Sequence, residues 1–171
     1  MDIILNRRSV RKFDSTKKVS NDDLLELLMY AEAAPSARRQ SSREYVIIND
    51  KEVISKLSKV STGAKVLDGC DVAIAVIGRD PNKLVTPGMQ PQDLSAAVQN
   101  ILLAATQKGI GSCWIGIYPT EDRTLAAGEV LKVKDNKFVF ALVALGYPQD
   151  ENAFYKWNKL TEDMISYNEV K

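Results

Sequence analysis

Histidine is absent from all 171 residues of the chain. Without it the protein cannot build a Ser-His-Asp triad or a Cys-His nucleophile pair, and a histidine-based zinc site is also excluded. If the protein is an enzyme, proton transfer falls to another side chain, to water or to the substrate. A bound cofactor could instead carry the difficult chemistry.

Cysteine and net charge are also scarce. Cys70 and Cys113 are the two cysteines, each beside an apolar segment, with neither a CxxC pair nor metal-ligand spacing. We therefore expect two buried free thiols and no metal. The 23 basic and 22 acidic residues leave a net charge of +1. This balance argues against a general nucleic-acid-binding surface.

Long apolar runs are missing as well. The longest, around Val72–Ile77 and Phe138–Leu145, are too short to span a bilayer. The apolar stretch at the start of the sequence is too short for the apolar region of a secretory signal peptide. We therefore expect a single domain over residues 1–171 in the cytoplasm, with neither a membrane nor a nucleic acid as its partner.

Positive charge gathers near the N-terminus. Residues 7–12 read Arg-Arg-Ser-Val-Arg-Lys, which places four cations and one hydroxyl within six positions. Arginine presents a planar fork of donors that fits phosphate oxygens in pairs, and a serine hydroxyl adds a neutral donor. The phosphate monoester of a bound cofactor would satisfy this group. The alternative is a solvated basic turn with no ligand.

Helical and extended patterns alternate along the chain. The expected helices cover residues 1–7, 21–34, 51–59, 91–108 and 120–131. The expected strands cover residues 44–49, 71–78, 112–118 and 137–145. Strands interleaved in this way with helices predict a sheet flanked by helices.

Two segments favour association with another chain. The helix over 91–108 is apolar or small on most faces, as in helices buried centrally or at a subunit interface. We expect its polar pair Gln99-Asn100 to hydrogen-bond across a buried interface. The polar extension 149–171 carries scattered aromatics, and we expect it to dock on a partner subunit.

The motifs RRSVRKF, AEAAPSA, a strand ending at Asp50, QDLSAAVQNILLAATQKGIGSCWIG and ALVALGYP follow one another along the chain. In this order and spacing they resemble the landmarks of the nitroreductase family of flavin-dependent oxidoreductases, from Leu5 to Lys159. The resemblance implies an α+β fold with a central, mostly antiparallel sheet. It also implies an intertwined homodimer with two FMN sites at its interface.

Family resemblance further implies an activity. Such enzymes pass hydride from NADH or NADPH to FMN and then reduce a small organic acceptor, such as a nitroaromatic or a quinone, in a ping-pong cycle. The chemistry takes place on N5 of the flavin, so we expect no catalytic side chain. An FMN-binding or sensing protein without physiological turnover is the alternative.

The resemblance also assigns residues to the cofactor. It implies that the FMN phosphate is held by Arg7, Arg8, Ser9 and Arg11. The loop that a neighbouring subunit lays against the flavin matches Pro35, Ser36 and Ala37, and the strand whose backbone passes the ring matches Trp114, Ile115 and Gly116. Lys159 matches an Arg or Lys near the C-terminus that reaches back to the phosphate in the family, and Lys156 is the alternative candidate for that position.

Each assignment has a plainer alternative. Arg8 could be a surface side chain, and Pro35–Ala37 could be a simple helix stop and N-cap. Gly116 permits close approach of a backbone to a ligand, but it could also mark a strand bulge. Lys159 could be a solvated tail lysine.

The chain departs from the family pattern after the APSA motif. Arg39 stands where the family commonly has an asparagine that reaches the polar edge of the flavin, so we expect it to bind cofactor. With Arg38 and Arg43 it is expected to add positive charge near the mouth of the site, which favours anionic substrates or the phosphates of NADPH. The segment before the long helix is short, so we expect an open site.

Overall fold

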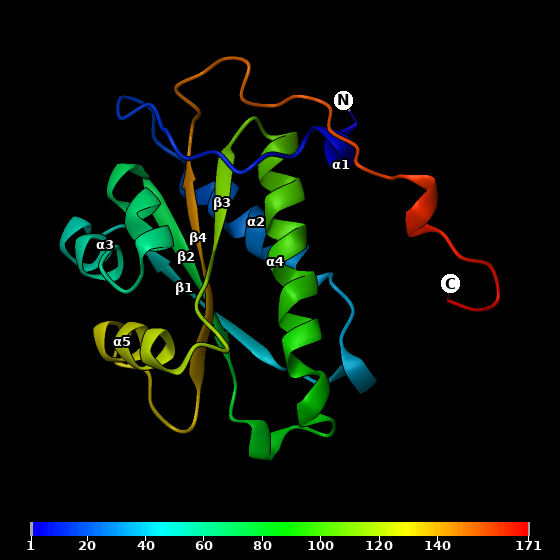
Figure 1. Ribbon diagram of the computed structural model, residues 1–171. Coiled ribbons are helices and arrows are strands. Elements are labelled where there is room, and N and C mark those ends of the chain that lie inside the picture. The colour runs from blue at the N-terminus through cyan, green and yellow to red at the C-terminus, as the bar shows by residue number, and fades with distance from the viewer. Residues whose placement is uncertain (1, 171) are drawn as a thin grey trace.

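The computed structural model describes residues 2–170 (Figure 1). Its α-helices are α1 (Ile3–Asn6), α2 (Asn21–Glu32), α3 (Lys51–Leu57), α4 (Gln90–Gln107) and α5 (Glu121–Leu131). Its strands are β1 (Arg43–Ile48), β2 (Val72–Gly78), β3 (Gly111–Gly116) and β4 (Phe138–Gly146). Short 3-10 helices lie at η1 (Ala37–Arg39), η2 (Thr62–Gly69), η3 (Pro81–Lys83), η4 (Pro87–Met89) and η5 (Glu162–Met164).

The strands form one sheet in the order β1-β2-β4-β3, and each neighbouring pair is antiparallel. The fold is therefore α+β with an antiparallel sheet flanked by helices, as the sequence predicts. The central strands β2 and β4 are buried along almost their whole length. Because both of their faces are covered, they read in the sequence as continuous apolar runs rather than as alternating ones.

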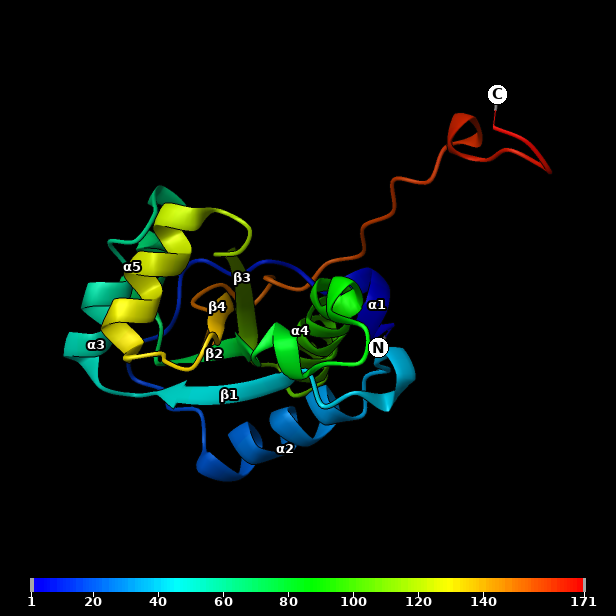
Figure 2. The ribbon, with the colours of Figure 1, turned by 90° about the horizontal axis from the view of Figure 1, so that it is seen from below.

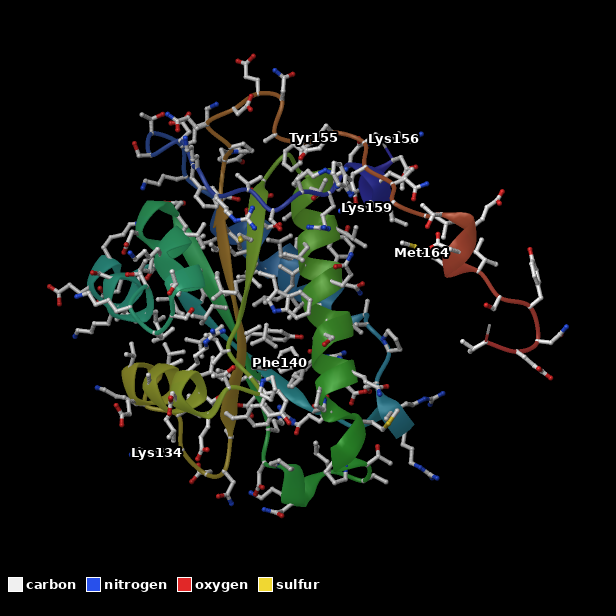
Figure 3. All side chains as sticks on the ribbon, viewed as in Figure 1. Lys134, Phe140, Tyr155, Lys156, Lys159 and Met164 are labelled. Carbon is white, nitrogen blue, oxygen red and sulfur yellow. The ribbon has the colours of Figure 1, made fainter. Side chains whose placement is uncertain are left out.

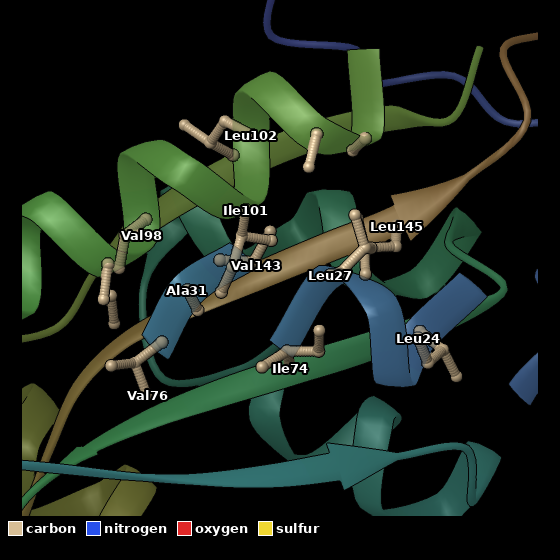
Figure 4. Packing of buried hydrophobic residues seen from close by; sticks show 14 of the residues in the cluster. Leu24, Leu27, Ala31, Ile74, Val76, Val98, Ile101, Leu102, Val143 and Leu145 are labelled. Atoms are coloured by element: carbon tan, nitrogen blue, oxygen red, sulfur yellow. The ribbon is translucent and has the colours of Figure 1, made fainter. Parts of the chain in front are cut away.

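Successive residues of the central strands face two different cores. Ile74 and Val76 of β2 pack with Leu27 of α2 and Ile101 of α4 (Figure 4). The intervening Ala73, Ala75 and Ile77 pack instead with residues of α3, η2 and α5. The sheet thus lies between two helical layers, and Figure 2 shows α2 and α5 on its opposite sides.

Capping residues set the helix ends. Ser20 accepts a hydrogen bond from the backbone N–H of Asp23 at 3.0 Å, as its position before an apolar stripe predicts. The helix it caps ends at Glu32, short of the predicted Ala34. The long helix α4 ends before Gly109, whose φ of 71° is left-handed and suits glycine.

One segment without a predicted element is helical. Residues 62–69, to which the sequence pattern assigns no element, form the 3-10 helix η2. Its buried residues Ala64 and Leu67 are three positions apart, which places them on one face at three residues per turn. Two buried positions are too short a pattern to identify such a segment from the sequence.

The C-terminal extension begins on its own protomer. The N–H of Gln149 donates to the carbonyl of Lys12 at 3.1 Å, and the N–H of Trp157 donates to the carbonyl of Leu5 at 3.0 Å. After Lys159 the chain leaves the body (Figures 1 and 2). There Met164 and Tyr167 are 64% and 83% exposed.

Candidate functional site

A basic pocket lies where the N-terminal segment crosses the sheet edge. Ser9 pairs with Ser112 of β3, and the N–H of Val10 donates to the Ser112 carbonyl at 2.9 Å. This pairing fixes the segment that carries the cations. The pocket measures about 450 Å³ and is lined by Arg7, Arg8, Ser9, Val10, Arg11, Lys12, Asp150, Ala153, Tyr155 and Trp157. The structure thus brings together the predicted phosphate cluster.

The charge of this pocket is unbalanced. Within residues 2–170, none of its four cations lies within 4.0 Å of a carboxylate oxygen. The one acidic residue of the lining, Asp150, accepts the N–H of Asn152 at 2.9 Å. Positive charge concentrated in a hollow attracts an anion.

Cys113 lies on β3 close to this charge. Burial raises the pKa of its thiol, and the nearby Arg11 and Arg7 offset that rise only in part. The thiol therefore stays protonated at neutral pH and is no nucleophile. It is a buried free cysteine, as is Cys70, whose pKa burial raises to about 11.

Arg8 is held by its own chain. One terminal nitrogen donates to the carbonyl of Leu5 at 2.8 Å, and the other donates to the carbonyl of Arg7. Its guanidinium carbon lies 4.5 Å from the ring centre of Tyr155 and 5.7 Å from that of Trp157. Its Nε is buried and has no hydrogen-bond partner within residues 2–170.

The loop after α2 is anchored to α4 by a buried carboxylate. Asp93 accepts the N–H of Ala37 at 2.8 Å and the side-chain amide of Gln40 at 2.9 Å. Between these anchors, Arg38 and Arg39 adopt left-handed φ values of 49° and 55° and are exposed. Because that conformation is costly for residues other than glycine, the anchors must hold it.

Arg43 contradicts the expectation of positive charge at the mouth of the site. Its side chain is buried and donates to the Glu32 carboxylate and to the carbonyls of Glu32, Ala34 and Asp93. The guanidinium therefore lies inside the protein, where it donates hydrogen bonds to free carbonyls at the end of α2. Arg38 and Arg39 remain as the exposed cations of this loop.

The two predicted halves of the cofactor site lie far apart in one chain. The N-terminal segment that carries the basic pocket passes the end of α4 that leads to β3 (Figure 1), whereas Pro35–Ala37 lie against the first turn of α4. The 18 residues of α4 span about 27 Å at 1.5 Å per residue. A single protomer therefore does not bring these residues together.

Strand β3 carries Trp114, Ile115 and Gly116, the residues predicted to pass the flavin ring. Trp114 is half-buried and its ring lies 6.3 Å from that of Phe140, on the α4 side of the sheet. Ile115 points the other way and is buried in the second core, so it can offer a ligand its backbone alone. Open space surrounds the position that a Cβ on Gly116 would take.

Lys156 and Lys159 lie at the same end of the molecule as α1 (Figure 3). Both are exposed, and neither lines the basic pocket. The ammonium of Lys159 lies 5.0 Å from the ring centre of Trp157.

Sequence reasoning missed the buried amide of Gln40 and the contacts of Tyr155 and Trp157 with Arg8. The aromatics of the polar extension were a visible signal, but nothing in the sequence paired them with Arg8. Asn100, expected to bond across a buried interface, donates to the Tyr30 carbonyl of α2 at 2.9 Å. Gln99 is exposed in the single chain.

From residue 2 to residue 170, none of the helices combines the length and apolar character needed to cross a membrane. Over the same residues, cysteines and carboxylates do not gather in threes where they could hold a metal ion.

Comparison with known proteins agrees with the motif order. The model of the nitroreductase family matches residues 4–66 and 62–147. The chain belongs to the nitroreductase family. A relative from Archaeoglobus fulgidus, named provisionally as an NADH dehydrogenase/NAD(P)H nitroreductase, is 40% identical over 157 residues, which cover 91% of this chain and 89% of the relative.

Solved nitroreductase-fold structures match the whole architecture. A Clostridium acetobutylicum protein, named provisionally as an NADH oxidase, has a TM-score of 0.91 at 36% identity and covers 98% of this chain and 99% of its own. An FMN-dependent nitroreductase from Clostridium difficile has a TM-score of 0.87 at 27% identity, with 98% of each chain covered. The family and the α+β fold predicted from the sequence are confirmed.

Proposed function

We propose that this protein transfers hydride from NADH or NADPH, by way of FMN, to a small organic acceptor such as a nitroaromatic or a quinone, in a ping-pong cycle. The chain is an FMN-dependent NAD(P)H oxidoreductase of the nitroreductase family. Its relatives carry names of that activity, and one solved structure of similar fold is named FMN-dependent. The basic pocket is the observation that carries the proposal to particular residues.

The pocket residues fit the phosphate of FMN. Arg7, Ser9 and Arg11 offer forked and hydroxyl donors in one hollow, and its cations have no carboxylate partner among residues 2–170. The buried Nε of Arg8 has no acceptor in the described part of the chain, and a phosphate oxygen would supply one. When bound, FMN supplies a ring nitrogen, N5, that takes up hydride and returns it.

The protein's own work is positioning and electrostatics. Arg7, Ser9 and Arg11 would hold the phosphate, and the backbone of Trp114–Gly116 would pass the ring. Lys159 and Lys156 stay the candidates for a further cation at the phosphate, although neither lines the pocket. Since the chain lacks histidine, solvent water would supply the proton that completes reduction of the acceptor.

A second copy of the chain completes this proposal. Pro35, Ser36, Ala37 and Arg39 are held about one α4 length from the basic pocket, so they would reach a flavin bound by another protomer. We place the extension 158–170 on that second copy, because its apolar side chains lie exposed and away from the body. The result is one domain per chain in an intertwined homodimer.

Removal of Arg7 tests the phosphate site. Loss of one charged hydrogen-bond donor is expected to raise the Kd for FMN about tenfold to a hundredfold in Arg7→Met. The Kd for riboflavin, which lacks the phosphate, should not change. Binding is measured by quenching of flavin fluorescence, with the exposed Lys65→Met as control. Equal weakening of both flavins in Arg7→Met would remove the phosphate from this pocket.

A further inference from the structure

We propose that Tyr155 and Trp157 of the C-terminal extension are positioning residues of the cofactor-phosphate site, which they complete by holding Arg8 in place. This inference rests on the proposed function, because it takes the pocket's ligand to be the phosphate of FMN. It assigns to the extension a role on its own protomer, in addition to any contact with a second copy.

The aromatic pair forms one wall of the pocket. Both rings line it, and they meet edge to face with their centres 6.4 Å apart and their planes at 73°. The guanidinium of Arg8 lies within cation–π distance of both, at 4.5 Å from Tyr155 and 5.7 Å from Trp157. Each ring is about half exposed, so the wall faces both the pocket and solvent.

A shared carbonyl links this wall to the phosphate cluster. The carbonyl of Leu5 accepts hydrogen bonds from the Arg8 side chain at 2.8 Å and from the Trp157 backbone at 3.0 Å. Arg8 also donates to the carbonyl of Arg7. The end of α1, the Arg8 side chain and the extension therefore form one unit, and movement of the extension would displace Arg7.

The chemistry of the contact suits an anion site. A carboxylate could hold Arg8 equally well, but it would cancel the positive charge that the phosphate needs. An aromatic face attracts the guanidinium through its quadrupole and leaves the net charge in place. Tyr155 and Trp157 thus fix a cation without neutralising it, which agrees with the absence of ion pairs around the pocket cations within residues 2–170.

A pair of substitutions separates the aromatic face from simple packing. Tyr155→Leu keeps an apolar side chain but removes the ring, whereas Tyr155→Phe keeps the ring. We expect the Kd of the flavin-free, full-length protein for FMN to rise about fivefold in Tyr155→Leu and to stay at the wild-type value in Tyr155→Phe. Trp157→Leu provides a second variant with the same expected direction.

A double-substitution cycle tests the path through Arg8. In an Arg8→Met background, Tyr155→Leu should add no further weakening, because the cation that the ring holds is already gone. Tyr30→Leu is the control, since Tyr30 is an exposed aromatic residue of α2 that does not line the pocket. Riboflavin binding should be unchanged in every variant.

The outcomes separate failure of this inference from failure of the proposed function. A wild-type Kd in both Tyr155→Leu and Trp157→Leu overturns this inference while the proposed function stands. The same holds if Tyr155→Leu weakens FMN equally with and without Arg8, or if it weakens riboflavin as much as FMN. Failure of the wild-type protein to bind FMN overturns the proposed function, and this inference with it.

Discussion

Arginine serves three different purposes within residues 7–43. Arg7 and Arg11 line a pocket and have no carboxylate partner between residues 2 and 170. Arg43 satisfies buried carbonyls at the end of α2, and Arg39 is exposed in a left-handed conformation. The sequence predicted the first group because four cations in six positions are conspicuous in a nearly neutral chain. It misplaced Arg43, because no local pattern reveals that a side chain at the start of β1 turns beneath a helix end.

Arg39 is expected to favour NADPH over NADH. It is exposed on the loop that we place near a flavin, where its charge would attract the additional phosphate of NADPH. Arg39→Ala should therefore raise the KM for NADPH several-fold, about what one exposed charge contact supplies, and leave the KM for NADH unchanged. Steady-state kinetics with both nucleotides measure this, with the exposed Lys65→Ala as control. An unchanged NADPH/NADH preference would contradict the assignment.

At the scale of elements, α4 organises the molecule. Its first turn holds the loop after α2 through Asp93, its middle packs on the sheet, and its last turn leads into β3 beside the basic pocket. The apolar spacing of the sequence predicted this helix and α2 well, since each buries a stripe against the sheet. The 3-10 helix η2 escaped prediction because two buried residues three positions apart are too short a pattern to identify a helix.

Lys108, just after α4, makes an acid-sensitive link to α2. Its ammonium bonds to Asp23 at 2.9 Å and also contacts Glu26. Hydrogen bonds from Ser20 and Lys108 lower the pKa of Asp23, and those from Lys108 and Tyr30 lower the pKa of Glu26. A carboxyl whose pKa is lowered by folding stabilises the protein above its unfolded pKa, and that stability is lost as pH falls through the folded pKa.

Lys108→Met should therefore lower the Tm at pH 7 and have less effect in acid. The difference should begin to shrink as pH falls below about 4, where unfolded aspartate and glutamate titrate, and should vanish only below the lowered folded pKa values of Asp23 and Glu26. Because both carboxylates are partly exposed, the effect at pH 7 should be modest. Thermal unfolding followed across this range checks it, with the exposed Lys59→Met as control. A Tm difference independent of pH would show that the link is not electrostatic.

At the scale of the whole molecule, the predicted site is divided between the two ends of α4. The family resemblance assigned the loop at Pro35–Ala37 to a neighbouring subunit, and the single chain keeps that loop away from its own pocket. Sequence alone could not show that residues 149–157 first follow the N-terminal segment of their own protomer, since this path rests on backbone hydrogen bonds. The docking of residues 158–170 on a second copy stays a prediction.

Light scattering should find a particle of twice the 19.0 kDa chain mass. If the extension docks on the second copy, Met164→Asp should shift the protein toward monomer, because a buried charge replaces an apolar contact. The monomer should also bind FMN more weakly, since the loop of the second copy is lost. Leu125→Asp, at a similarly exposed position on α5, is the control. A wild-type monomer that binds FMN fully would contradict the shared site.

Anaerobic reduction of the flavin-loaded protein tests the central claim most directly. We predict that NADH or NADPH bleaches the visible absorbance of bound FMN when no acceptor is present. Addition of a quinone or a nitroaromatic, after excess nucleotide is removed, should restore the oxidised spectrum, as two separate half-reactions require. A bound flavin whose spectrum neither nucleotide changes would contradict the oxidoreductase assignment and indicate a protein that binds or senses FMN without turnover.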